Sequence, residues 1–363
     1  MAINLKETLL DLIKFKTVSG NDNQSEVLRL FSYVTKMTPN NYKSRIVNVN
    51  GFNSLIIEPA RKAWRNKTVV LLGHVDVVNA DEKQFEPKVK SGKIYGRGAS
   101  DMKFAIAVFT KLISEVNTKF RLKIVLTSDE EIGGTNGTKY LQKNGEFDNS
   151  KVVILPDGGN DFDLVVAEKG VLHIEVTSSG KSSHGSKPWE GVNAIEKLIE
   201  NYSKLKRDFN DFTKTHWVNT ASIGIISGGD TVNTVPKSAC MKIDVRFTEN
   251  FTEAEILEKI RKTFKGCTVK VIASGQPFCL DKQRKEVRLL LDTIKKHTGS
   301  YPNDYYDHGA SDARFFPKNT SVLIFKPLSG GHHTDKEWVD IKSLETYYEV
   351  LKDFLVNLNK LQP

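Results

Sequence analysis

The sequence has few cysteines and no long apolar run. Its three cysteines, Cys240, Cys267 and Cys279, are far apart, and none belongs to a CxxC pair. An odd, scattered set of this kind predicts reduced thiols, which are typical of cytoplasmic proteins. No apolar stretch reaches the length of about 18 residues that a transmembrane helix requires, and the N-terminal stretch has acidic residues where a secretory signal needs an uninterrupted apolar run. We therefore expect a cytoplasmic protein with no membrane partner.

The sequence also lacks a concentrated charge of one sign, although its formal net charge is +9. Lys and Arg residues are spread along the chain among Asp and Glu residues, and no basic stretch is interleaved with aromatic residues. This distribution argues against nucleic-acid binding and favours a lysine-rich surface that attracts small anions. The GxSxG motif is absent as well, which leaves a Ser/His/Asp hydrolase of that class unsupported.

Apolar runs predict a mixed α/β domain. At 363 residues, the chain is long for a single core, so two domains are expected. Strand and helix segments alternate in the N-terminal half, which indicates a layered α/β sheet. The predicted buried strands are 67–73, 123–128 and 151–156, and the predicted helices are 102–116 and 136–144.

A different pattern occupies the middle of the chain. Between residues 170 and 283, strands and helices follow one another in the order β-α-β-β-α-β, which is that of a ferredoxin-like unit. Further helix and strand segments then follow to the C-terminus. We therefore predict one domain formed by residues 1–169 and 284–363, and an inserted domain formed by residues 170–283.

Polar residues stand at or just beyond the carboxyl end of each predicted buried strand. Ligands bind beyond the carboxyl ends of strands in open α/β sheets. Imidazole and carboxylate groups gathered there are suited to Zn²⁺ or Mn²⁺. The strand-end residues are His74 and Asp76, then Asp129, Glu130 and Glu131, and then Asp157. Asp101 at the start of a helix and His332 and His333 near the C-terminus complete the candidates.

The motifs GHVDVV, YGRGASDMK, TSDEEIGG, LPDGG and a late HxxxE follow one another over nearly the whole chain. In this order they resemble the M20 family of co-catalytic metallopeptidases. That family includes succinyl-diaminopimelate desuccinylase, acetylornithine deacetylase, aminoacylase-1, glutamate carboxypeptidase and several di- and tripeptidases. The resemblance implies a zinc-peptidase-like mixed-sheet catalytic domain with an inserted ferredoxin-like α+β domain. This inserted domain would serve as a lid and would form a homodimer.

The resemblance implies two divalent metal ions, with Zn²⁺ as the first expectation and Co²⁺ or Mn²⁺ as alternatives. The implied ligands are His74, Asp101, Glu131, Asp157 and His333. Asp101 would bridge the two ions, and the family has a cis peptide bond at the position of Asp101 and Met102. Of the two tail histidines, His333 is preferred to His332 because only His333 stands four residues before an acid, Glu337.

The resemblance also assigns catalytic roles. Glu130 would be the general base and acid, because it would take a proton from the attacking water and give it to the leaving nitrogen. Asp76 would orient His74. His184, in GKSSHGSKPWEG, would stabilise the oxyanion as the lid histidine.

Substrate-binding positions are implied in two further segments. Asn233 and Arg246 match positions that contact the substrate, and a guanidinium is suited to bidentate binding of a carboxylate. Gly309, Ala310 and Ser311 match the family's glycine-rich substrate loop.

The predicted function is cleavage of an amide or peptide bond next to a free carboxylate. An N-acyl-amino-acid deacylase of the desuccinylase or deacetylase kind is the first expectation, on the basis of chain length. A di- or carboxypeptidase is the alternative, which Asp157 and the GKSSHGSKPWEG segment favour. A catalytically silent binding protein on the same fold is a remote alternative.

Overall fold

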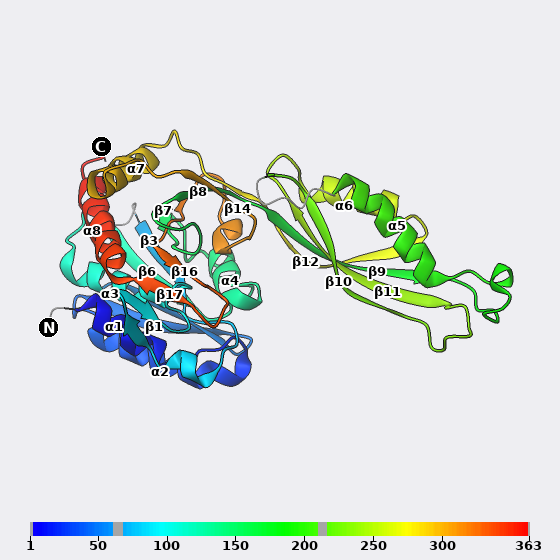
Figure 1. Cartoon of the computed structure of the whole chain (residues 1–363). Coiled ribbons are helices and arrows are strands. Elements are labelled where there is room, and N and C mark those ends of the chain that lie inside the picture. The colour runs from blue at the N-terminus through cyan, green and yellow to red at the C-terminus, as the bar shows by residue number, and fades with distance from the viewer. Residues whose placement is uncertain (1–2, 61–67, 210–215, 362–363) are drawn as a thin grey trace. The chain divides into compact units, whose positions relative to one another are not determined.

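The computed structural model describes residues 3–60, 68–209 and 216–361 (Figure 1). The chain forms two compact units. The first unit comprises Met1–Val166, Leu280–Tyr305 and Ser311–Pro363, and the second comprises Ala167–Cys279 and Tyr306–Ala310. The short segment Tyr306–Ala310, which the sequence-based division leaves in the catalytic domain, groups with the second unit. Each unit is described separately below.

A six-stranded mixed sheet forms the centre of the first unit, as the α/β prediction requires. Its strand order is β1-β2-β6-β3-β7-β15. Strands β6, β3, β7 and β15 are parallel, whereas β1 and β2 run antiparallel to their neighbours. The strands are β1 (Tyr42–Val49), β2 (Phe52–Pro59), β3 (Thr68–His74), β6 (Arg121–Thr127), β7 (Ser150–Ile154) and β15 (Ser321–Leu323).

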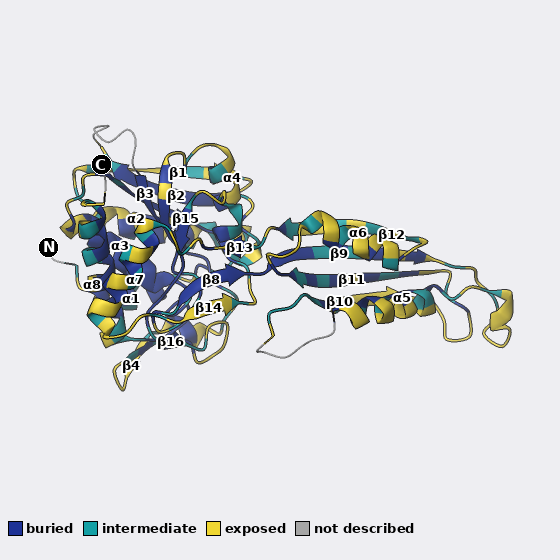
Figure 2. Ribbon diagram, turned by 90° about the horizontal axis from the view of Figure 1, so that it is seen from above, coloured by how far each residue is buried: buried dark blue, intermediate teal, exposed yellow. Residues whose placement is uncertain are grey.

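The parallel strands are apolar because both of their faces are covered. Every residue of β3 is buried, and so is every residue of β6 after Arg121 (Figure 2). Strands buried on both faces form near-continuous hydrophobic runs, and this is the signal by which β3, β6 and β7 were predicted. Their observed ends differ from the predicted ends by one or two residues, and position 67 lies outside the described residues.

Helices surround this sheet (Figure 1). Helix α3 packs against β3, and helices α1 and α8 pack against α3, so ten of the thirteen residues of α3 are buried. Helix α2 packs against β2, and α7 packs against α8. These helices are α1 (Leu5–Ile13), α2 (Gln24–Met37), α3 (Lys103–Glu115), α4 (Thr138–Lys143), α7 (Lys285–Thr298) and α8 (Ile341–Leu358).

Two smaller sheets are present besides the central six-stranded sheet and the main sheet of the second unit. One has the order β16-β17-β5-β4 and the other the order β13-β8-β14. Their strands are β4 (Lys88–Lys90), β5 (Lys93–Tyr95), β8 (Leu164–Glu168), β13 (Phe278–Cys279), β14 (Asp304–Asp307), β16 (Ser329–Gly330) and β17 (Trp338–Asp340). Over the described ranges, no helix is long and apolar enough to cross a membrane.

The second unit is an antiparallel sheet with two helices on one face (Figure 1). The sheet order is β10-β11-β9-β12. Along the chain the elements are β9 (Gly170–Ser179), α5 (Ala194–Asp208), β10 (Thr220–Gly228), β11 (Ser238–Phe247), α6 (Glu253–Thr263) and β12 (Cys267–Gly275). This is the β-α-β-β-α-β succession of a ferredoxin-like unit. The predicted roles of this unit as a lid and in dimerisation stay predictions.

The core of the second unit lies between its sheet and its helices. Leu198 and Leu205 of α5 and Ile256 and Ile260 of α6 are buried together with apolar side chains of β9 and β11. The outer strands are less covered, since most residues of β10 and β12 are exposed or only partly buried. Antiparallel sheets commonly have one solvated face.

Candidate metal centre

The parallel strands deliver candidate ligands to one edge of the central sheet. His74 is the last residue of β3, and Glu130 and Glu131 open the 3-10 helix η3 (Glu130–Ile132) that follows β6. Asp157 follows the end of β7. Because β6, β3 and β7 are adjacent and parallel, their carboxyl ends lie at the same edge.

Asp101 lies between two histidines. Its Oδ1 atom is 3.0 Å from Nε2 of His74, and its Oδ2 atom is 3.0 Å from Nε2 of His333. The peptide bond between Asp101 and Met102 is cis, as the resemblance implies. The two oxygens of one carboxylate therefore face two different imidazoles.

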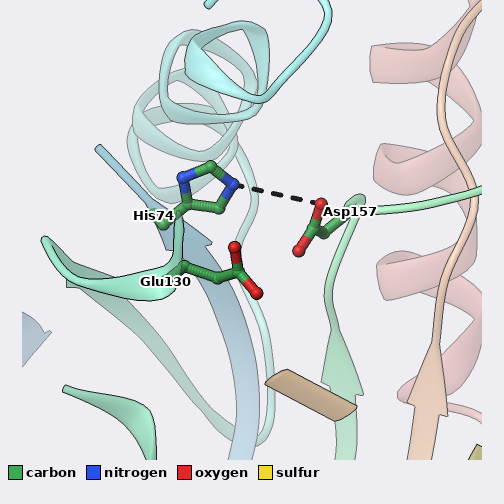
Figure 3. A group of neighbouring side chains, drawn as sticks. All are labelled: His74, Glu130 and Asp157. Carbon is green, nitrogen blue, oxygen red and sulfur yellow. Dashed lines mark ion pairs between the residues drawn. The ribbon is translucent and has the colours of Figure 1, made fainter. Parts of the chain in front are cut away.

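Each histidine also faces a second carboxylate. Nε2 of His333 lies 3.2 Å from Oε2 of Glu131. Nε2 of His74 lies 3.9 Å from Oδ1 of Asp157, as the dashed line in Figure 3 marks. The structure thus brings all five implied ligands together, with one histidine–carboxylate pair on each oxygen of Asp101.

Glu130 lies beside this arrangement (Figure 3). The candidate ligand atoms of His74, Glu130 and Asp157 lie within 4.8 Å of one another, and so do those of His74, Asp101 and Glu131. His74 therefore belongs to two overlapping groups of potential metal-binding side chains.

Burial and neighbouring carboxylates raise the pKa values of two acidic side chains at this edge of the sheet. Burial raises the pKa of Asp157 to about 7, and the charge of Asp101 adds to this effect. Burial also raises the pKa of Glu130 well above its usual value, with the charges of Asp157 and Asp312 acting in the same direction. Both groups are costly to ionise unless positive charge is brought near them.

Hydrogen bonds between Asp101 and the histidines favour the charged forms of these groups, as their pKa values show. Burial acts to raise the pKa of Asp101, but hydrogen bonds with His333 and His74 hold it well below its usual range. Burial acts to lower the pKa of His74, but hydrogen bonds with Asp101 and Asp76 raise it well above its usual value. Hydrogen bonds to Asp101 and Glu131 raise the pKa of His333 to about 10.

The donor set fits divalent cations. Oε1 of Glu131 is buried and has no hydrogen-bond partner within the described part of the chain. A buried carboxylate oxygen without a donor is costly unless a cation compensates it. The imidazole nitrogens and carboxylate oxygens gathered here are the ligand types that Zn²⁺ and Mn²⁺ accept.

Asp76 supports the turn that carries the two glutamates. Its Oδ1 accepts a hydrogen bond from the backbone N–H of Glu130 at 3.3 Å, and its Oδ2 accepts one from Glu131 at 3.1 Å. Ser19 Oγ also donates to Oδ2 at 2.9 Å. Nδ1 of His74 lies 2.9 Å from the backbone oxygen of Asp76 and 3.5 Å from its Oδ1. The backbone contacts to the glutamate turn were not foreseen from the sequence.

Asp129 has a different role from its two acidic neighbours. Its Oδ2 accepts a hydrogen bond from the backbone N–H of Asn136 at 2.7 Å, and its backbone oxygen accepts one from Gly134 at 2.7 Å. Burial raises its pKa to about 6. Asp129 therefore shapes the loop that follows the glutamates.

Sequence reasoning did not single out Arg97, Asp312 and Lys326, three buried charged residues of the first unit. It used Glu337, which is also buried, only for its spacing from His333. The charge of Lys326 lowers the pKa values of Asp101 and Asp157, whereas that of Asp312 raises the pKa of Glu130. A signal was available for Lys326, because this lysine directly follows the apolar run 322–325, which predicts a buried segment.

The predicted lid residues lie in the second unit. Nδ1 of His184 lies 2.8 Å from Oγ of Ser186, and the backbone of His184 pairs with that of Thr234. The backbone N–H of Gly185 donates to the backbone oxygen of Asn233 at 2.7 Å. The segments carrying His184 and Asn233 thus lie side by side, and both side chains are exposed.

Arg246 lies on β11 with its guanidinium held by a neighbouring carboxylate. Its Nε donates to Oδ1 of Asp244 at 2.8 Å, and its Nη2 donates to Oδ2 at 3.1 Å. Asp244 orients the guanidinium and offsets its charge.

The predicted substrate loop is divided between the units. The backbone N–H of Gly309 donates to Oδ1 of Asp307 at 2.8 Å, and Gly309 and Ala310 belong to the second unit. Ser311 belongs to the first unit, where its Oγ accepts from the backbone N–H of Ala313 at 3.2 Å.

Comparison with known proteins shows related sequences and folds over the whole chain. Residues 70–357 match the model of peptidase family M20/M25/M40. A succinyl-diaminopimelate desuccinylase of Sulfurovum sp. is 29% identical, over 97% of this chain and 98% of that protein. A [LysW]-lysine/[LysW]-ornithine hydrolase of Sulfurisphaera tokodaii is 27% identical, over 96% of this chain and 95% of that protein. The crystal structure of an M20 family metallo-carboxypeptidase from Sulfolobus solfataricus shares the fold, with a TM-score of 0.80, 19% identity and coverage of 99% and 100% of the two chains.

Proposed function

The chain belongs to peptidase family M20/M25/M40 and is a metal-dependent hydrolase, and on this premise we propose that it removes the acyl group from an N-acyl amino acid. A desuccinylase or deacetylase reaction is the first candidate. The observation that carries this proposal is the arrangement of His74, Asp101 and His333 with Glu130 beside it. The full-length relative named as a desuccinylase supports the choice of substrate class.

The five ligands divide into two sets around Asp101. We assign His74, Asp101 and Asp157 to one divalent ion, and Asp101, Glu131 and His333 to a second, on the basis of the contacts at each oxygen of Asp101. Zn²⁺ is the first candidate, and Co²⁺ and Mn²⁺ are alternatives. These residues would hold the ions, which would supply Lewis-acid chemistry: polarisation of the scissile carbonyl and a lower pKa of the attacking water.

Glu130 moves the proton. Its carboxylate accepts a proton from the attacking water and delivers it to the leaving nitrogen, which makes the amine a better leaving group. Burial beside Asp157 raises its pKa, and a raised pKa makes the carboxylate a stronger base. Asp76 holds Glu130 in place through the backbone of the turn and faces His74.

Substrate binding is assigned to the second unit and to Ser311. Arg246 binds the substrate carboxylate, Asn233 contacts the substrate, and His184 stabilises the developing oxyanion. Gly309, Ala310 and Ser311 line the substrate pocket. The bidentate pairing with Asp244 supports this role for Arg246, because it fixes the plane of the guanidinium. A homodimer through the second unit and a cytoplasmic location belong to the same proposal.

A di- or carboxypeptidase is the second candidate. The residue at position 157 favours it, because the family has Glu here in its desuccinylase branch and Asp in several peptidases. Both candidates use the same centre and the same proton transfer, so only the substrate distinguishes them.

A hydrolysis screen tests the proposal. N-succinyl and N-acetyl amino acids and dipeptides are supplied in parallel, with Zn²⁺, Co²⁺ or Mn²⁺ added to the metal-free protein. Faster turnover of an N-acyl amino acid supports the deacylase, whereas faster turnover of a dipeptide replaces it with the peptidase. Fewer than about one bound ion per chain after reconstitution, with no turnover, would favour a binding protein instead.

A further inference from the structure

The buried carboxylate of Glu337 connects two segments of the first unit. Only 1% of Glu337 is exposed. Its Oε1 accepts hydrogen bonds from the backbone N–H of Ser100 at 2.8 Å and of Asp101 at 3.0 Å. Its Oε2 accepts a hydrogen bond from Nη1 of Arg97 at 2.6 Å. One side chain thus holds the loop that ends at Asp101.

Further contacts fasten the segment of Glu337 to the same region. The backbone N–H of Gly96 donates to the backbone oxygen of Glu337 at 3.1 Å. Nε2 of Gln84 donates to the backbone oxygen of Thr334, directly after His333, at 2.9 Å. The backbone N–H of Arg97 donates to the backbone oxygen of Gln84 at 2.8 Å. The loop carrying Asp101 and the segment carrying His333 are therefore held as one assembly.

We propose that Glu337 is a positioning residue for the metal centre. It sets the metal affinity by holding the carboxylate of Asp101 and the ring of His333 in the relative position at which they lie 3.0 Å apart. This proposal rests on the proposed function, because it takes Asp101 and His333 as ligands. A fixed backbone nitrogen at Asp101 restricts rotation of that residue, so both carboxylate oxygens stay directed at His74 and His333. Charge-assisted hydrogen bonds in a buried environment are strong enough to impose this geometry.

The competing explanation is that the pair of Glu337 and Arg97 only stabilises the fold and has no effect on metal binding. Breaking a buried ion pair destabilises a protein wherever the pair lies, so lower stability is expected in either case. Only a positioning role predicts that metal affinity falls in protein that is still folded. Metal affinity, measured apart from activity, is therefore the deciding readout.

Two substitutions separate the effect of the charge of Glu337 from the effect of the length of its side chain. Glu337→Gln keeps the length of the side chain and removes the charge that pairs with Arg97. Glu337→Asp keeps the charge and withdraws the oxygens from the N–H groups of Ser100 and Asp101. Ser329→Ala is the matched control, because it removes a buried contact of 2.9 Å to Oγ of Ser100 in the same loop without touching Glu337 or the backbone of Asp101.

The experiment titrates Zn²⁺ into metal-free protein in competition with a chromophoric chelator, after circular dichroism has established that each variant is folded. Loss of a residue that supports a metal ligand lowers metal affinity by about 10–100-fold. We expect a loss of this size for both Glu337 variants and a change below about twofold for Ser329→Ala.

The proposal is overturned if a folded Glu337 variant binds Zn²⁺ as tightly as the parent, or if Ser329→Ala weakens binding equally. It is also overturned if neither Glu337 variant folds as metal-free protein, because Glu337 is then a folding residue. A parent protein that binds no Zn²⁺, Co²⁺ or Mn²⁺ would instead remove the proposed function, so the two failures are distinct.

Discussion

The two units of the chain carry their functional residues in different ways. In the first unit, three of the candidate ligands, His74, Glu131 and Asp157, stand at or just beyond the ends of buried strands, and Asp101 and His333 contact them from neighbouring segments. In the second unit, His184 and Asn233 are exposed residues of paired loops beside a sheet with one covered face. The candidate metal centre is thus tied to the core, whereas His184 and Asn233, two of the proposed substrate-binding residues, lie on a surface that can change with little cost to folding.

The comparison predicts its largest effect at Glu130. Glu130→Gln should lower kcat by about 10²–10⁴-fold, because the proton acceptor is lost, while bound metal stays at the parental level. Steady-state kinetics and metal analysis of the purified variant test this. Glu131→Gln is the control and should lose metal. Loss of metal from Glu130→Gln, with metal retained in Glu131→Gln, would mean that the roles of the two glutamates are exchanged.

A smaller effect is expected for the exposed histidine of the second unit. His184→Ala should lower kcat by about 10²–10³-fold, the usual cost of removing one oxyanion donor, with metal content unchanged. The variant Ser186→Ala removes the neighbour that contacts His184 and should have much less effect. Parental turnover in His184→Ala would exclude the histidine from the reaction.

The carboxylate-binding role of Arg246 should appear mainly in KM. Arg246→Met is expected to raise KM by about 10–100-fold, because a hydrogen bond to a charged group contributes about 1.5–3 kcal/mol. Lys242→Met, a change on the same strand, serves as the control. An unchanged KM in Arg246→Met would show that the guanidinium only pairs with Asp244.

The smallest expected effect concerns how the free energy of unfolding depends on pH. It compares a buried acid, Asp129, with a half-exposed one, Asp244. The pKa of Asp129 is raised to about 6, so its contribution to stability is complete below its unfolded pKa and is lost as the pH rises to about 6. Asp129→Asn should remove this loss, which is on the order of 2 kcal/mol. Urea unfolding of the metal-free protein at several pH values between 4 and 7 measures it.

For Asp244 in the second unit, the contribution to stability changes with pH in the opposite direction. Its pKa is lowered to about 2, since hydrogen bonds with His173 and Arg246 outweigh the effect of burial, so its contribution is present above its unfolded pKa and is lost as the pH falls toward 2. Because this carboxylate is half-exposed, solvent screening should keep the effect of Asp244→Asn below about 1 kcal/mol. Equal pH effects in the two variants would contradict the contrast between the units.

The sequence predicted the features that depend on local patterns. Apolar runs gave β3, β6 and β7, because strands covered on both faces must be apolar throughout. The position of His74, the two glutamates and Asp157 after those runs then placed them at one edge. The preference for His333 rested on its spacing from Glu337; in the structure, His333 contacts Asp101 and Glu131, and its role as a ligand stays a prediction.

The features that the sequence did not predict depend on contacts between distant segments. The carboxylate of Asp76 holds the backbone of Glu130 and Glu131, which no local pattern indicates. The pairing of Arg97 with Glu337 spans 240 positions of the chain. Such contacts appear only when the strands and loops are placed in space.

The discontinuous first unit has a consequence for synthesis on the ribosome. The contact between Asp101 and Glu337 joins residues 236 positions apart, and β15 adds its strand to the central sheet from the same late part of the chain. The second unit, made of nearly continuous chain, emerges before those residues do. Since domains tend to fold as units during translation, we expect the second unit to fold while the candidate metal centre still lacks His333. A ribosome stalled before that point would carry a protein that cannot yet complete its metal site.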